Sequence, residues 1–145
     1  TRRWRAIPGP TPREHLGVTS LAGTIYAIAG RTGGIDTNLL DFESYRTGQR
    51  SWTRLPAVPD PRGGTGATAL NGQIVSVGGE EPQGTIPEVL AYSVAGRRWR
   101  QLESLRTPRH GLGVAAFDGR VFVIGGGTEP GLTVSTANES LPVPR

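Results

Sequence analysis

The chain has 145 residues, of which 35% are hydrophobic and 19% charged, as in a folded globular protein. It has no cysteine, which excludes disulfides, thiolate metal sites and cysteine nucleophiles. No apolar run approaches the ~18 residues of a membrane span and no basic-then-apolar leader opens the chain, so we expect a soluble protein without a membrane partner, of unknown compartment.

The net charge of +4 comes from 16 basic residues, all of them arginine. Eight of these flank the three tryptophans: Arg2, Arg3, Arg5, Arg50, Arg54, Arg97, Arg98 and Arg100 around Trp4, Trp52 and Trp99. Charge at one strand position of each repeat discourages sheet edges from pairing. We therefore favour edge protection over a nucleic-acid partner.

A pattern of nearly fifty residues occurs three times along the chain. Each copy has a proline followed by arginine, a glycine five residues after the proline, and a second glycine eleven residues after it. A small-residue pair closes the pattern. The copies begin at Pro12, Pro61 and Pro108, and the pairs are Ala29-Gly30, Gly78-Gly79 and Gly125-Gly126.

In chain order, each copy predicts four strands. A small-residue first strand, such as residues 111–117, leads to the turns at 22–23, 71–72 and 118–119, where Asn-Gly and Asp-Gly are strong hairpin signals. The second strands are residues 25–30, 74–79 and 121–126, apolar enough to be buried on both faces. Variable loops at 31–38, 80–87 and 127–135 follow. A third strand then ends at Tyr45 or Tyr92, and a fourth strand holds Trp52 or Trp99.

This pattern resembles the kelch repeat, and its tail at residues 125–141 is similar to the closing blade of bacterial kelch-repeat proteins. The resemblance implies an all-β propeller whose loop face, around a central channel, binds a protein or a polar ligand, including an anionic one. We expect an outer strand at residues 1–10 and repeats at 11–58, 59–105 and 106–145, the last without a fourth strand of its own.

The candidate ligand-binding residues lie on the face where the loops and the blade-to-blade connections emerge. They are Arg13, His15, Arg31, Arg62, Glu80, Glu81, Arg109 and His110. The arginines after the three prolines have two open roles, since they can line the channel mouth or tie blade to blade. Two histidines are too few for a metal centre, and Glu80 and Glu81 can also be merely solvated, so we expect no metal and no cofactor.

A binding module is the leading functional interpretation, and catalysis is the alternative. The resemblance also covers sialic-acid mutarotases, whose arginine and carboxylate groups act at the channel mouth without a metal. The copper-radical oxidases of similar fold need a tyrosine-cysteine crosslink, which a chain without cysteine cannot form.

Closure of the ring raises a separate question. Three blades are too few for a propeller, and kelch propellers usually have six, so we expect either half of a longer chain or a homodimer of two half-rings. In both cases a strand like the one around Trp4 pairs with residues 136–143 of the third blade.

Overall fold

The computed structural model describes residues 2–144, and within them it contains strands and no helix. Three antiparallel sheets follow one another along the chain, and we call them blades 1 to 3. Blade 1 consists of β1 (Gly17–Leu21), β2 (Thr24–Ile28), β3 (Phe42–Arg46) and β4 (Thr53–Arg54). Blade 2 consists of β5 (Gly66–Leu70), β6 (Gln73–Val77), β9 (Val89–Ser93) and β10 (Arg98–Gln101). Blade 3 has β11 (Gly113–Phe117), β12 (Arg120–Ile124) and β13 (Asn138–Pro142).

The predicted hairpin turns are confirmed by their backbone angles. Asn71 and Gly72 have φ of 52° and 75°, and Asp118 and Gly119 have 47° and 72°. Two successive residues with positive φ give the turn the twist that matches the flanking strands. The first hairpin adopts the same turn with Ala22 at φ 49°, although alanine is unfavourable there.

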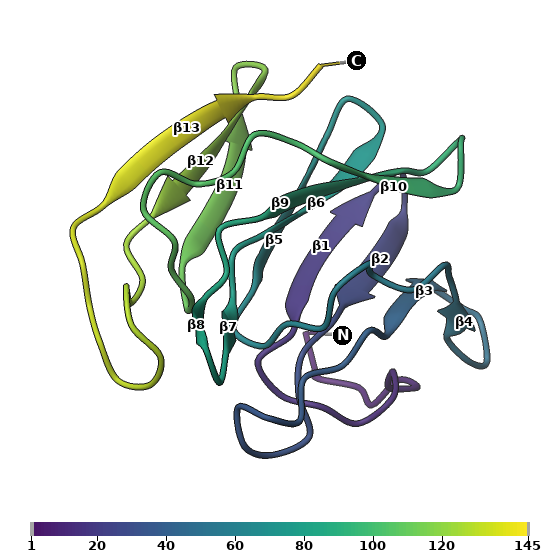
Figure 1. The fold of residues 1–145 in the computed structure, drawn as a ribbon. Helices are drawn as coiled ribbons and strands as arrows, with labels where there is room; N and C mark the ends of the chain where they lie inside the picture. The colour runs from purple at the N-terminus through teal and green to yellow at the C-terminus, as the bar shows by residue number, and fades with distance from the viewer. Residues whose placement is uncertain (1, 145) are drawn as a thin grey trace.

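One predicted loop contains additional structure. Residues 80–87 hold a small hairpin of β7 (Glu80–Glu81) and β8 (Gly84–Thr85). It projects from blade 2 at the bottom of Figure 1, beside the loops that follow β2 and β12. These loops emerge on one side because every strand of a blade reverses direction, and we call that side the loop face.

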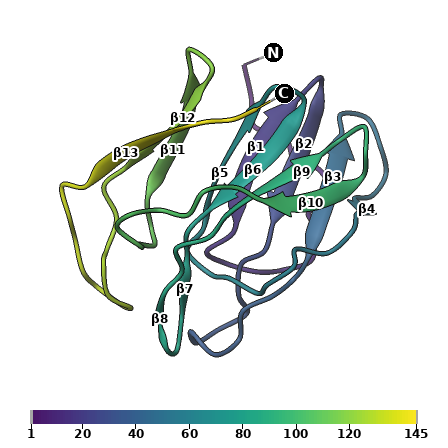
Figure 2. The ribbon, with the colours of Figure 1, turned by 45° about the horizontal axis from the view of Figure 1, so that its top comes forward.

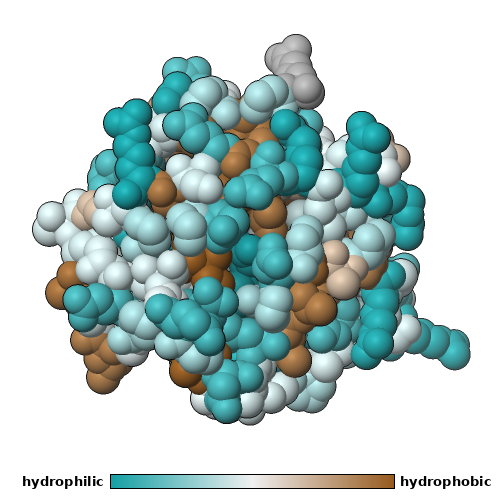
Figure 3. All heavy atoms as spheres, viewed as in Figure 1, coloured by the Kyte–Doolittle hydropathy of each residue, from teal (hydrophilic) through white to brown (hydrophobic). Residues whose placement is uncertain are grey.

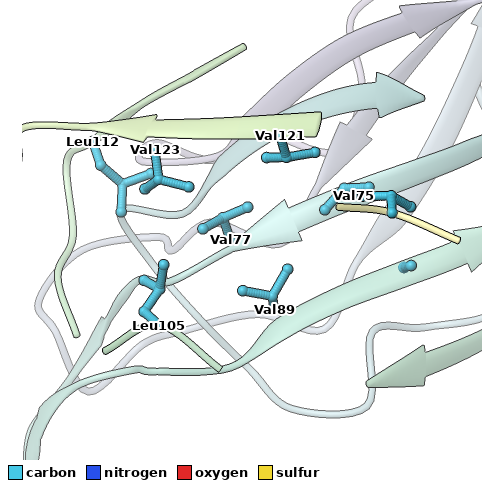
Figure 4. Close-up of a cluster of buried hydrophobic side chains, with 9 residues drawn as sticks. Val75, Val77, Val89, Leu105, Leu112, Val121 and Val123 are labelled. Carbon is cyan, nitrogen blue, oxygen red and sulfur yellow. The ribbon is translucent and has the colours of Figure 1, made fainter. Parts of the chain in front are cut away.

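The blades are stacked so that β1, β5 and β11 lie side by side, with the later strands of each blade farther out (Figures 1 and 2). Two apolar clusters fill the spaces between the sheets. Aromatic rings dominate the space between blades 1 and 2, where Phe42 meets Tyr92 with ring centroids 4.9 Å apart. Figure 4 shows the aliphatic cluster between blades 2 and 3, with Val75 and Val77 facing Val121 and Val123.

The second strand of blade 2 is buried along its whole length, as predicted, because a sheet covers each of its faces. Blade 3 is covered on one face only. Phe117 and Ile124 on its other face are 73% and 52% exposed. Apolar side chains also reach the surface at the lower left of Figure 3, where the loop after β12 carries exposed Leu132 and Val134.

The tryptophans pack as their spacing predicts. Trp52, just before β4, stacks on Tyr45 with centroids 5.4 Å apart, and Trp99 in β10 lies 5.2 Å from Tyr92. Their indole Nε1 groups donate to the carbonyls of Pro8 and Pro56, each at 2.9 Å. Each tryptophan is therefore hydrogen-bonded to the segment that follows the tryptophan of the repeat before it.

The ends of the stack are open, since the three sheets do not form a closed ring. Residues 2–10 form no strand in the single chain, and Trp4 is fully exposed. Among the residues that the structure describes, blade 3 has three strands, and β13 is its free edge. Within residues 2–144 no helix is long and apolar enough to cross a membrane.

Candidate functional site

The arginines that follow the repeat prolines are buried inside the blades. The side chain of Arg13 has no exposed surface and donates to the carbonyl of Ala29 at 2.7 Å and to the Glu43 carboxylate at 2.5 Å. Arg109 makes the same bonds in blade 3, to Gly125 at 2.8 Å and to Glu139 at 2.5 Å. Each guanidinium group thus fastens the incoming connection to the second and third strands of its own blade.

These bonds shift the pKa of both carboxyl groups. Burial raises the pKa of Glu139, but hydrogen bonds from Arg109 and from the backbone amides of Arg106 and Thr107 outweigh it, so the pKa lies below its ordinary value. Glu43 has a lowered pKa for the same reason, through Arg13 and Thr11. Both carboxylates are therefore charged partners of buried cations at neutral pH.

Arg62 occupies the same place in blade 2 but has no carboxylate partner. The residues fourteen positions after the arginines, Ala27, Ser76 and Val123, pair across the sheet with Glu43, Leu90 and Glu139. Leu90 thus stands where the other blades have glutamate. Arg62 donates to the carbonyls of Glu88 at 3.2 Å and Gly78 at 3.5 Å, and its Nη2 is buried without a partner. Burial lowers the pKa of this guanidinium, and the charges of Glu88, Asp60 and Glu81 act against that shift.

The backbone at the same positions joins neighbouring blades. The amide of Gly30 donates to the carbonyl of Arg62 at 2.9 Å, and the amide of Gly79 donates to that of Arg109 at 3.1 Å. The three guanidinium groups bond within their own blades, so the contact between neighbouring blades at these positions comes from the backbone carbonyls of Arg62 and Arg109. The side chains have a structural role, but they tie each blade to its own incoming connection and not blade to blade.

Two of the other predicted site residues, Arg31 and His110, converge on the Glu80 carboxylate. This side chain is only 2% exposed, and it lies 2.9 Å from Nη1 of Arg31 and 3.5 Å from Nδ1 of His110. Its second oxygen accepts from the backbone amide of Gly131 at 2.9 Å. Arg31 comes from blade 1, Glu80 from blade 2, and His110 and Gly131 from blade 3. We call this arrangement the Glu80 network.

His15 extends the network to the surface. Its Nε2 lies 3.1 Å from Nη2 of Arg31, and its Nδ1 lies 3.4 Å from the Glu14 carboxylate. His15 therefore contacts Arg31 and is not paired with His110. Glu81, the neighbour of Glu80, is exposed. No cluster of three or more histidine, aspartate or glutamate side chains suited to a metal ion occurs in residues 2–144.

Asn38 supports the network from the loop that follows β2. Its amide nitrogen donates to the carbonyl of Glu80 at 2.7 Å, while its Oδ1 is buried without a partner. The bond joins the loops of blades 1 and 2 a second time, beside the pair of Arg31 and Glu80. The loops of the three blades are therefore held together by side chains as well as by the stacked sheets.

The charge of this surface is negative. Arg31 faces two carboxylates, Glu14 and Glu80, at 3.4 and 2.9 Å. The nearby loops add further exposed acidic side chains, which are Asp36, Glu81 and Glu129. These five carboxylates outnumber Arg31, so the surface offers more negative than positive charge, and a cationic or hydrogen-bond-donating group suits it best.

Sequence spacing identified these loops but missed the partners of the buried arginines. Glu43 and Glu139 each follow their arginine by thirty residues. That shared spacing was the available signal. In blade 2 the equivalent residue follows its arginine two residues sooner, and it is Leu90. The signal therefore occurs in only two of the three copies.

The stacked antiparallel sheets, each closed by a small-residue pair after its second strand, define a repeat protein built from propeller-type blades. Residues 12–59 match the family model for the kelch motif, and this range contains all four strands of blade 1. The chain therefore carries a kelch motif over these residues, and this motif supports a propeller-type interaction module. No curated protein matches the sequence.

Proposed function

We propose that this kelch module binds a protein or a polar ligand on its loop face, over the Glu80 network. The observation that carries the proposal is the convergence of Arg31 and His110 on a carboxylate that is 2% exposed. A buried ion pair contributes little net stability compared with apolar packing, so its value here lies in fixing the loops of three blades. Fixed loops present His15 and Glu81 in a constant arrangement, which lowers the entropy lost on binding.

The charges select the chemistry of the partner. Arg13, Arg62 and Arg109 are buried, and Arg31 is paired with carboxylates, so these arginines offer little to an anion. We therefore propose a partner segment rich in arginine or lysine. The mutarotase alternative needs guanidinium groups at the channel mouth, and the burial of these arginines gives it no support.

Fluorescence anisotropy with labelled peptides tests this proposal. A lysine-rich heptapeptide should bind in a salt-dependent manner, and an acidic heptapeptide should not. Glu81→Gln should weaken the basic peptide several-fold, because it removes one exposed charge of the loop face. Asp118→Asn is the matched control, since it removes one exposed acid from the β11–β12 turn. Equal binding of both peptides, or an equal effect of Glu81→Gln and Asp118→Asn, would contradict the proposal.

We also propose that a second copy completes blade 3 and gives a six-bladed ring. The support comes from the tryptophan bonds. Trp52 and Trp99 donate to Pro8 and Pro56, each four residues after the preceding tryptophan. The next acceptor in this series is the carbonyl of Glu103, and Glu103 lines a cavity of about 380 Å³ beside the free edge of β13. Trp4 from another copy has the matching position in the repeat.

Light scattering on the purified chain tests this assembly. The expected mass is twice 15.4 kDa. Trp4→Ala should shift the protein toward monomer, whereas Arg3→Ala should leave the mass unchanged. A monodisperse monomer of the unmodified chain would contradict the assembly, and it would leave the peptide-binding proposal to its own test.

A further inference from the structure

A second surface feature lies between blades 1 and 2, on the side opposite the loop face. It is a cleft of about 280 Å³ near the turns that follow β3 and β9. Both blades line it, blade 1 with Tyr26, Ser44 and Arg46, and blade 2 with Tyr92 and Arg97. Its walls are strands of the two packed sheets, together with Gln49 and Arg97 in the turns.

The polar residues that line this cleft all carry hydrogen-bond donors, and none of the lining residues has a carboxylate. Arg46 and Arg97 line the cleft together with five residues that carry hydroxyl groups, which are Thr24, Tyr26, Ser44, Thr53 and Tyr92. Within residues 2–144 no salt bridge joins Arg46 or Arg97 to an acidic side chain. Their positive charges are therefore not neutralised by the protein, in contrast to Arg31 in the Glu80 network.

The two tyrosine rings are held in place by the aromatic cluster beneath them. Phe42 stacks on Tyr26 at 5.9 Å and meets the edge of Tyr92 at 4.9 Å. Burial raises the pKa of Tyr92, the Arg97 charge acts against this shift, and Tyr26 adds to it. The Tyr92 phenol is thus protonated at neutral pH, and the positive charge of Arg97 acts on it.

We propose that this cleft binds a small phosphomonoester such as a sugar phosphate. A phosphate dianion has three terminal oxygens that accept bonds from several directions, and two guanidinium groups with five hydroxyls provide such a set of donors. A carboxylate has two oxygens in one plane and uses fewer of these donors. Leu55 and Val94, which also line the cleft, give an apolar wall for the carbon skeleton of the ester.

The cleft is distinct from the loop face in position and in charge. Its ligand is anionic and small, whereas the partner proposed for the loop face is a basic protein segment. Occupation of one site does not require the other. Failure of the peptide experiment therefore leaves the cleft proposal intact, and the reverse also holds.

NMR titration of the ¹⁵N-labelled protein with glucose 6-phosphate tests the proposal, with glucose and inorganic phosphate as comparison ligands and sodium chloride at matched ionic strength. We expect saturable shifts for residues around Arg46 and Arg97. Glucose should give none, and inorganic phosphate should bind more weakly than the ester, because it makes no contact with the apolar wall. Equal affinity for inorganic phosphate would overturn the assignment of an ester.

Substitutions locate the site. Arg46→Gln and Arg97→Gln should each weaken glucose 6-phosphate about 10-fold or more, since each removes a hydrogen bond between charged groups. Tyr92→Phe should weaken it several-fold without changing the net charge. Arg120→Gln, an arginine of blade 3 outside the cleft, should have no effect. Shifts that never saturate, or an equal loss in Arg120→Gln, would show only general charge attraction and would overturn the proposal.

Discussion

Replacement of Arg109 by methionine tests whether the buried arginines hold each blade and its incoming connection together. Arg109 donates four hydrogen bonds, one to Glu139 at 2.5 Å and three to the carbonyls of Thr107, Val123 and Gly125 at 2.8 to 2.9 Å. Methionine keeps much of the apolar stem but leaves these acceptors without their donor. Loss of one member of a buried ion pair typically costs about 3–5 kcal/mol. We expect about 3 kcal/mol, because the Glu139 side chain is 22% exposed and regains some hydration.

Arg62→Met is the matched comparison within the same protein. Its bonds to Asp60, Gly78 and Glu88 are longer, at 3.2 to 3.5 Å, and its Nη2 has no partner. Removing this charge also removes the cost of burying it, so we expect a loss of about 1 kcal/mol. Arg106→Met, at an exposed side chain, should change stability by less than about 0.5 kcal/mol.

Urea denaturation followed by tryptophan fluorescence measures the three free energies of unfolding, with equal m-values as the check that one transition is compared. The expected order of loss is Arg109, then Arg62, then Arg106. Equal losses for Arg109→Met and Arg62→Met would refute the importance of the carboxylate partner. Unchanged stability in Arg109→Met would refute the structural role altogether.

Two further perturbations follow from the same geometry. Glu43 and Glu139 have lowered pKa values in the folded protein, so the stability they contribute is complete above the unfolded pKa of 4.5 and declines as the pH falls below it. Urea denaturation at a series of pH values should show this decline, and the decline should be smaller in Glu139→Gln. Gly66→Ala should destabilise by about 1–3 kcal/mol, because its Cβ would clash with the Val114 side chain at the interface of blades 2 and 3. Gly113→Ala, at the same position on the open face of blade 3, should leave the free energy of unfolding of the single chain nearly unchanged in the same assay and weaken only its assembly with a second copy.

The scaffold was predictable because repeated residues impose the same backbone three times. Asn71-Gly72 and Asp118-Gly119 need positive φ in any hairpin of this kind, and the small-residue pairs mark where each second strand ends. A pattern that occurs at constant spacing reports local geometry, and local geometry was sufficient to place eleven strands in three blades.

The side-chain environment of each arginine was less predictable. Arg13, Arg62 and Arg109 have identical places in the repeat, yet two have a carboxylate partner and one has Leu90 instead. The partner of each arginine comes from the third strand of its blade, which lies far away in sequence and follows a loop of variable length. The Glu80 network was similarly hidden, because its members come from three blades and meet only after the sheets have stacked.

The variant Leu90→Glu introduces a carboxylate where blades 1 and 3 have glutamate. It tests whether a glutamate at this repeat position is enough to form an ion pair with the buried arginine. Leu90 is 3% exposed and packs in the cluster between blades 1 and 2, so a glutamate there loses apolar contact and must be desolvated. In the unmodified background the new carboxylate can bond to Arg62, as Glu43 and Glu139 bond to their arginines. In the Arg62→Met background it has no such partner. We therefore expect Leu90→Glu to cost at least about 2 kcal/mol more in Arg62→Met than in the unmodified chain, because breaking a buried pair is far costlier than its net contribution. A double-mutant cycle from urea denaturation measures this difference directly. Additive losses would mean that the backbone of blade 2 holds Arg62 out of reach of position 90, and that the shared repeat position does not fix the geometry of the pair.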